Sequence, residues 1–290
     1  MSVTGLSRLS KPHYIFRPSQ LVRRFVLASS EPEPLVQTPW GCQMLVARND
    51  VIGAGIARMG VHELGVSEVM WRLSQGDELA IDVGANVGYF TGLLACRAQE
   101  VIALEPNPRL HRFIAGNIQR WGTREKIVLD TRAASTQEGT ATLHLPSEYA
   151  ENFGIGTLEP VAGTGSYEVA TVRLDDVIAG RNVGVLKIDV EGHELSALEG
   201  ASDSLVRHLI RDIVFEDHQP LPSPVSQMLE SAGFAIWGIE QALTSPRLVS
   251  ERAPQGWDAP TYLATREPER IKRLMRSRGW HCLRRVKRKP

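Results

Sequence analysis

The chain has 290 residues, enough for one large α/β domain with extensions or for two small domains. Its 33 Lys and Arg balance 33 Asp and Glu, and 42% apolar residues with 23% charged residues are typical of a globular protein. Three scattered cysteines exclude a disulfide framework or a zinc site, and the lack of any long apolar run excludes a membrane-spanning helix.

The charges are unevenly placed along the chain. From Arg266 to Pro290 there are 11 basic and 2 acidic residues, which leaves 22 basic and 31 acidic residues in the other 265. The first 30 residues hold five basic and no acidic residues but lack the apolar core of a secretory signal. A transit peptide is one interpretation of this stretch, and a basic arm is the favoured one. With so few cysteines, we expect a reducing, cytoplasmic location.

Composition divides the chain into an arm and linker over 1–38, a cap over 39–76, a core domain over 77–265 and a basic tail over 266–290. In the cap we expect ordered structure from about Trp40, a strand over 41–46 and a short helix from about Ser67 to Leu73. The run Gly53-Ala54-Gly55-Ile56 lacks the Lys-Ser/Thr ending of a phosphate-binding loop, so it does not predict one.

The core begins with an apolar strand that ends in the turn Asp82-Val83-Gly84-Ala85-Asn86-Val87-Gly88, followed by a helix. A dinucleotide-binding turn keeps carboxylates away from the pyrophosphate, whereas Asp82 here would repel it. A ligand with an ammonium, a sulfonium and ribose hydroxyls suits this acid better. The turn therefore predicts a site for S-adenosylmethionine.

The second strand, over 101–105, ends in Glu105, about 20 residues after Gly84. An acid at this place reaches the ribose hydroxyls of an adenosyl ligand. The alternative is a surface carboxylate at a strand end. Asn107 and Pro108 then predict the start of an amphipathic helix that Gly122 ends.

Further strands are expected over 127–130, 183–189, 212–216, 234–239 and 262–264, with a helix ending over 228–233. This alternation predicts an α/β fold, a Rossmann-like, doubly wound and mostly parallel sheet with helices on both faces. Between them, residues 135–177 form an insertion with half-buried strands over 141–145 and 169–174 and a glycine-rich loop over 152–165. We expect the insertion to shape the substrate site.

Two pairs of polar residues end neighbouring strands. Lys187 and Asp189 are two apart and point to one face, as do Glu216 and His218, while Glu191 follows in the turn. These strand ends place the polar groups around one crevice, and Asp189 would contact the cofactor or the substrate. Lys187 has the alternative role of neutralising a buried carboxylate.

The chain resembles the FkbM-type S-adenosylmethionine-dependent methyltransferases in four short stretches, residues 82–90, 105–108, 187–194 and 198–200. The resemblance extends over about Gly41 to Glu240. The resemblance implies a class I methyltransferase that methylates a hydroxyl on a sugar, glycolipid, polysaccharide or related secondary metabolite. It also implies that Glu63 lies near the cofactor pocket. The predicted cofactor-binding residues are Glu63, Asp82, Gly84, Asn86, Gly88, Glu105 and Asp189.

Methyl transfer to a hydroxyl requires removal of a proton, for which histidine is suited near pH 7. The catalytic candidates are His218, His193 and Asp189. We favour His218 as the base because it extends directly from a core strand, whereas His193 opens a helix. A divalent cation held by Asp189 and Glu216 is an alternative, although we predict no metal site.

Two other functions are compatible with the pattern. The basic tail, which includes Trp280, could dock RNA or protein, or an anionic lipid surface, although a solvated helix with a frayed end is the commoner role of such a tail. The fold could also bind an adenosyl ligand without catalysis. We expect a small-molecule or glycan acceptor and predict no oligomeric state.

Overall fold

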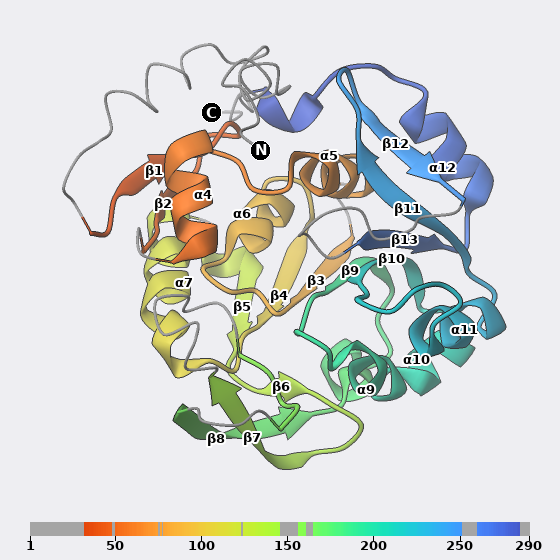
Figure 1. Ribbon diagram of the computed structural model, residues 1–290, viewed down its shortest axis with the longest axis horizontal. Helices are drawn as coiled ribbons and strands as arrows, with labels where there is room; N and C mark the ends of the chain where they lie inside the picture. Colours follow the sequence, from red (N-terminus) through yellow and green to blue (C-terminus); the bar gives the residue numbers. More distant parts are fainter. Residues whose placement is uncertain are drawn as a thin grey trace, which may run out of the picture.

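The computed structural model of the protein describes residues 32–47, 50–74, 76, 78–122, 124–145, 156–160, 165–250 and 260–284. An eight-stranded sheet lies at the centre of this described part of the chain (Figure 1). Its strands lie in the order β12 (Pro246–Val249), β11 (Ala235–Gln241), β13 (Thr261–Thr265), β10 (Ile210–Glu216), β9 (Val183–Ile188), β3 (Leu79–Val83), β4 (Glu100–Leu104) and β5 (Ile127–Asp130).

The five strands from β10 to β5 are parallel, and β13, β11 and β12 add antiparallel pairings at the other edge. The chain order reverses between β3 and β9, because β4 and β5 extend to one side and β10 to the other. In a doubly wound sheet, ligands bind in the crevice outside the carboxyl ends of the strands at this point. The predicted Rossmann-like sheet is confirmed.

Helices cover both faces of the sheet (Figure 1). Strand β3 illustrates the division, because Ala80 packs on one face and Ile81 and Val83 pack on the other. One face carries α5 (Leu64–Leu73), α6 (Tyr89–Ala95) and α7 (Pro108–Trp121), and the other carries α8 (Leu174–Ile178), α9 (Glu194–Glu199), α10 (Ser202–Val206) and α11 (Pro224–Ser231).

Helix α7 has the predicted ends. The Asn107 side chain accepts from the backbone N–H of Arg109, Pro108 occupies the first turn, and Gly122 adopts a left-handed conformation at the C-cap. The short helix η1 (Arg124–Lys126) then leads into β5.

The N-terminal region is more regular than predicted. Strand β1 (Leu35–Gln37) lies within the stretch taken as linker, and it pairs with β2 (Gln43–Leu45). The glycine-rich run lies inside α4 (Val51–Met59), where a Cβ on Gly53 would come 2.0 Å from the Ala47 carbonyl oxygen, so only glycine allows this approach. Helix α5 begins at Leu64, three residues earlier than predicted, and ends before Ser74. Residues 1–31 lie outside the described part.

The insertion contributes β7 (Gly139–Leu145) and β8 (Gly165–Val172) to a separate sheet, whose third strand is β6 (Ala133–Ala134), directly before the insertion. The predicted strand over 169–174 is too long at its end, because α8 already begins at Leu174. Of the glycine-rich loop, only residues 156–160 and 165 are described, and its remainder lies outside the described residues.

The basic C-terminal segment folds back onto the core. It contains α12 (Pro268–Met275) and the short helix η3 (His281–Leu283). The buried Arg72 guanidinium of α5 donates to the carbonyls of Leu274, Ser277 and Gly279 at 3.1, 2.8 and 2.8 Å, and it is paired with the buried Glu68 at 2.6 Å.

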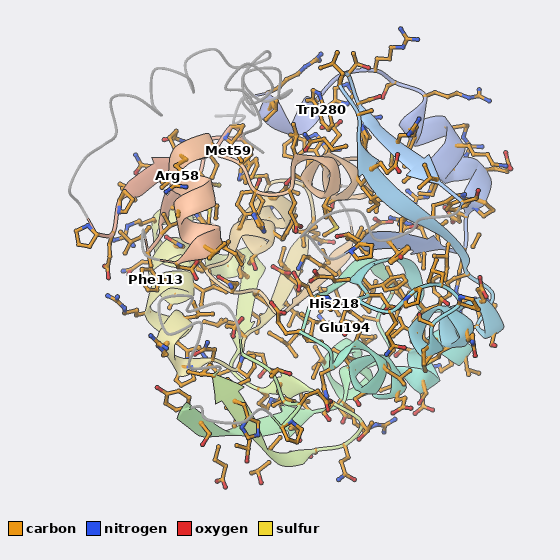
Figure 2. All side chains as sticks on the ribbon, viewed as in Figure 1. Arg58, Met59, Phe113, Glu194, His218 and Trp280 are labelled. Carbon is orange, nitrogen blue, oxygen red and sulfur yellow. The ribbon has the colours of Figure 1, made fainter. Side chains whose placement is uncertain are left out.

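Trp280 is buried beside α5 and its indole N–H donates to the carbonyl of Leu243 (Figure 2). It is therefore not available to stack on a nucleic acid base. Residues 285–290 of that tail lie outside the described chain. No helix in the part of the chain described here is long and apolar enough to cross a membrane.

Candidate active site

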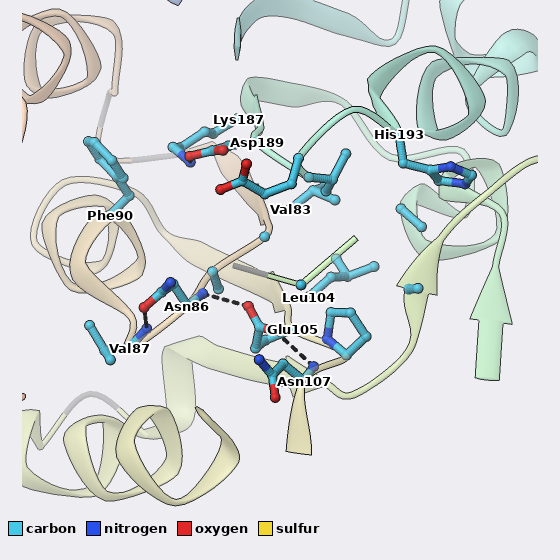
Figure 3. A pocket seen from close by; sticks show the side chains of 18 of the residues that line it. Val83, Asn86, Val87, Phe90, Leu104, Glu105, Asn107, Lys187, Asp189 and His193 are labelled. Atoms are coloured by element: carbon cyan, nitrogen blue, oxygen red, sulfur yellow. Dashed lines mark hydrogen bonds and ion pairs between the residues drawn. The ribbon is translucent and has the colours of Figure 1, made fainter. Parts of the chain in front are cut away.

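A cavity lies at the carboxyl ends of β3, β4 and β9, and the insertion forms its far wall. It encloses about 860 Å³ of empty space when the open solvent at its mouth is included. The titratable groups that line it are His62, Tyr89, Glu105, Lys187, Asp189, Glu191 and His193. Figure 3 labels four of them, Glu105, Lys187, Asp189 and His193.

The glycine turn forms the floor of this cavity. Gly84 has φ +79°, and a Cβ there would lie 1.8 Å from the carbonyl oxygen of Asp189, so the turn and the loop after β9 touch through backbone alone. Asn86 also has a positive φ and its side-chain oxygen accepts from the N–H of Val87 at 2.7 Å. Gly88 serves as the N-cap of α6. The predicted residues Gly84 and Asn86 line the cavity, while Gly88 lies behind them.

Glu105 presents its carboxylate to the cavity. One oxygen accepts from the backbone N–H of Asn86 at 2.7 Å and the other from that of Asn107 at 2.8 Å (Figure 3). Burial raises the pKa of Glu105 to about 7. Because each carboxylate oxygen has a further lone pair, the group can still accept two hydroxyl donors.

Asp82 does not line the cavity but lies beneath it, fully buried. One oxygen accepts from the Thr91 hydroxyl at 2.6 Å, and the other has no hydrogen-bond partner among the described residues. Burial raises the pKa of Asp82, against the opposing effect of the Lys187 ammonium. Asp82 and Lys187 are direct cross-strand neighbours in β3 and β9, which explains their proximity.

The buried Lys187 and the half-buried Asp189 form an ion pair at 2.9 Å, and the Lys187 ammonium also lies 4.8 Å from the centre of the Phe90 ring. Burial opposes ionisation of Asp189, but Lys187 outweighs it and lowers the pKa of Asp189 to about 2. The predicted neutralising role of Lys187 matches this pair. A carboxylate with so low a pKa is a poor proton acceptor, so the property that Asp189 offers to a ligand is its negative charge.

Further acids surround this pair. Glu63, the N-cap of α5, and Glu216 line a smaller cavity that shares Lys187 and Asp189 with the larger one. Burial and the Asp189 carboxylate raise the pKa of Glu216, so Glu216 is protonated at neutral pH and shares a hydrogen bond with Asp189. Burial also raises the pKa of Glu191 to about 7. Part of both shifts comes from the negative charge of Asp189, which in the same way favours a ligand that carries a positive charge.

His193 lies on the opposite wall, next to the insertion, and in Figure 3 its ring points away from Asp189. The Glu194 side chain holds the loop that carries it by accepting from the N–H groups of Val190 and Gly192. The ring nitrogen Nε2 lies 3.2 Å from the Ser135 hydroxyl, and Nδ1 lies 3.4 Å from a carboxylate oxygen of Glu159.

His218, which the sequence favours as the base, is not among the residues that line either cavity, and its side chain is exposed. Strand β10 ends at Glu216, so the alternation that would carry His218 to the same side as Glu216 stops there. The buried Asp217 instead accepts from the Ser223 hydroxyl and from the N–H of Gln219, which turns the chain towards α11 (Figure 2 labels His218).

The structure adds site residues that the sequence did not single out. His62 lines the cavity, with its Nε2 atom 3.8 Å from Glu63 and its ring edge-on to Tyr89. Because His62 directly precedes Glu63, which was predicted to lie near the cofactor pocket, the sequence did hold a signal that could have identified it. Ser135 and Glu159 lie in the insertion, and no local pattern indicated that they meet His193. No cluster of three or more His, Cys, Asp or Glu residues in the described ranges is arranged to hold a metal ion.

Comparison with curated proteins finds methyltransferases. The chain is 29% identical over 202 residues to the hexuronic acid methyltransferase AglP of Haloferax volcanii, which covers 68% of this chain and 74% of that protein. It is 27% identical over 185 residues to methyltransferase 1 of Beauveria bassiana, covering 55% of this chain and 73% of the relative.

Among solved structures, the crystal structure of the methyltransferase FkbM from Methylobacillus flagellatus KT matches with a TM-score of 0.42 and 15% identity. The match covers 73% of this chain and 60% of that chain. The family model described as the methyltransferase FkbM domain matches residues 82–236, more than half of the chain and all of the strands from β4 to β10. The protein therefore belongs to the FkbM methyltransferase family.

Proposed function

We propose that this methyltransferase uses S-adenosylmethionine to methylate a hydroxyl oxygen of a sugar, glycan or related metabolite. The site's chemistry fits that cofactor: Glu105 offers free lone pairs for ribose hydroxyls, and the buried Asp82 has an oxygen without a partner beneath an acidic cavity. When bound, the cofactor supplies a methyl group on a positively charged sulfur.

The chain's own residues divide the remaining work. Glu105 would hold the ribose, with Asn86 and Gly84 shaping the turn beneath it and Gly88 starting α6. Asp189, together with Asp82 and Glu63, would stabilise the positive charge of the cofactor. Lys187 keeps Asp189 ionised and in place.

The position of His193 is the observation that supports a hydroxyl group as the methyl acceptor. His193 lines the same cavity as Glu105, and its Nε2 atom already contacts a hydroxyl, that of Ser135. A hydroxyl becomes a sufficient nucleophile only if its proton is removed, and an imidazole can take it near neutral pH. We therefore assign the base to His193 in place of His218. The likeness to AglP, named for methylation of hexuronic acid, supports a sugar as the acceptor.

The acceptor class is tested by incubating the protein with S-adenosylmethionine and, separately, uronic acid oligosaccharides, neutral oligosaccharides, tRNA and a mixed protein substrate. Formation of S-adenosylhomocysteine together with a methylated sugar, seen by mass spectrometry, is expected. His193→Gln should lower that rate by roughly 100-fold while cofactor affinity stays unchanged. Methylation of RNA or protein instead, or binding of the cofactor without turnover on any acceptor, would contradict the proposal.

Binding of S-adenosylhomocysteine should strengthen between pH 6 and pH 8. The pKa of Glu105 is about 7, and only its ionised form accepts both ribose hydroxyls, so the affinity falls as the pH drops below that value. Glu105→Gln should bind roughly 10- to 30-fold more weakly at pH 8 and should depend less on pH, because only Glu191 then titrates near pH 7 among the acids with that pKa in the cavity. Calorimetry across the pH series measures both effects.

Glu100→Gln is the matched control, because Glu100 is half-exposed at the opposite end of the same strand, paired with Arg181. It should bind like the wild type at every pH. Equal affinity of the Glu105→Gln variant and the wild type would remove Glu105 from the cofactor site.

A further inference from the structure

Three segments that are distant in the sequence converge on His193. Ser135 precedes β7, His193 precedes α9, and Glu159 lies in the short segment 156–160 between β7 and β8. The Ser135 hydroxyl and the Glu159 carboxylate contact opposite nitrogens of the imidazole ring, at 3.2 and 3.4 Å.

The segment that carries Glu159 is fixed to the loop that carries His193. The Thr157 hydroxyl donates to the carbonyl of Glu191 at 2.9 Å and accepts from the N–H of Glu159 at 3.1 Å. Thr157 is buried and also exchanges backbone hydrogen bonds with His144 of β7. Glu159 is therefore presented to His193 by ordered backbone, although its side chain is mostly exposed.

The chemistry of these partners selects one tautomer of His193. An ionised carboxylate can only accept hydrogen bonds, so Nδ1 must carry the proton that faces Glu159. Nε2 is then unprotonated, and the Ser135 hydroxyl donates to it. The nitrogen that can take a proton thus faces a hydroxyl, and the opposite nitrogen faces an anion that stabilises the imidazolium formed.

We propose that Glu159 is a positioning residue that holds His193 in the Nδ1–H tautomer needed to accept the proton of the methyl acceptor. This inference rests on the proposed O-methylation. When the acceptor hydroxyl takes the place of the Ser135 hydroxyl at Nε2, its proton binds that nitrogen. His193 later returns the proton to solvent, and the positive charge that the ring holds in between is balanced by Glu159. The insertion would thereby supply the residue that orients the base, in addition to shaping the acceptor site.

The tautomer is measured by two-bond ¹H–¹⁵N correlation spectra of the histidine rings, with the His193 signals identified by their absence in His193→Gln. The wild type should show the Nδ1–H form. Glu159→Ala should shift the ring towards the Nε2–H form, and Glu159→Gln, which keeps an acceptor oxygen, should restore the Nδ1–H form. Because the Glu159 side chain is mostly exposed, neither Glu159 variant is expected to unfold the protein.

Turnover provides the second measurement. Glu159→Ala should lower kcat by roughly two- to fivefold, the range expected for a solvent-screened charge, without changing the KM for the acceptor. Glu159→Gln should lie between it and the wild type. Glu168→Ala is the matched control, since Glu168 is an exposed acid in β8 of the same insertion and pairs with Thr142 across the strands.

An unchanged His193 tautomer in Glu159→Ala, or an equal loss of kcat in Glu168→Ala, would overturn the role of Glu159. The two levels of proposal fail separately. If no sugar is methylated, the proposed function fails while the spectra still decide whether Glu159 orients His193. If sugars are methylated and His193→Gln is slow but both Glu159 variants match the wild type, only this inference fails.

Discussion

Replacing Gly84 with alanine is expected to destabilise the protein by about 2–5 kcal/mol and to abolish measurable binding of S-adenosylhomocysteine. The added Cβ would lie 1.8 Å from the Asp189 carbonyl oxygen, and the backbone there has φ +79°. Neither the turn nor the loop after β9 can yield without moving the other, and both form the cavity floor. Urea denaturation gives the loss in the free energy of unfolding, and calorimetry gives the loss of affinity.

Gly122→Ala separates the two causes of this effect. Gly122 also has a positive φ, at +64°, but a Cβ there would meet nothing within 4 Å. This variant should lose only about 1–2 kcal/mol and should keep its affinity. If both variants are equally destabilised and Gly84→Ala still binds the ligand, the close contact between turn and loop has no role in the site.

Lys187→Met is expected to destabilise the protein by about 3–5 kcal/mol at pH 7, since it leaves the buried Asp82 and the half-buried Asp189 without their cation. In the wild type, the lowered pKa of Asp189 contributes stability that is present above the unfolded pKa near 4 and is lost as the pH falls towards about 2. In the variant burial dominates and raises that pKa, so ionisation at pH 7 opposes folding. The deficit relative to wild type should therefore shrink between pH 7 and pH 5.

The double variant Lys187→Met with Asp189→Asn is the control. It removes both charges, so it should be more stable at pH 7 than Lys187→Met alone, and its stability should depend less on pH. Urea denaturation at each pH provides the comparison. A Lys187→Met deficit that stays constant from pH 7 to pH 5 would show that the loss comes from packing against Phe90 and not from the unpaired carboxylates.

The parts of the fold that the sequence predicted are those with local signals. The strand, glycine turn and helix around Gly84, and the helix capped by Asn107 and Gly122, are determined by residues next to one another in the chain. Glu105 and Lys187 were found because strand ends in a parallel sheet meet at one edge, which sequence spacing can indicate.

The rest depends on long-range packing. Position 53 of α4 is a glycine because the backbone at Ala47 passes too close to leave room for a side chain. Nothing near Gly53 in the sequence indicates that approach. His218 was misplaced because β10 ends at Glu216, where Asp217 finds a hydrogen-bond partner in Ser223. Glu159 meets His193 only through the fold of the insertion, so its role had no signal in the sequence.

The hydrogen bonds between Arg72 and the C-terminal segment affect how the activity of a protein truncated before that segment should be interpreted. The basic composition after Arg266 suggests an appendage that can be removed. However, backbone groups of residues 274–282 form hydrogen bonds with two buried side chains of α5, Arg72 and Glu68. The N-cap of that helix, Glu63, lines the smaller cavity. A shortened protein would lose the partners at the other end of the same helix, so loss of activity after such a deletion is not evidence that the segment touches substrate.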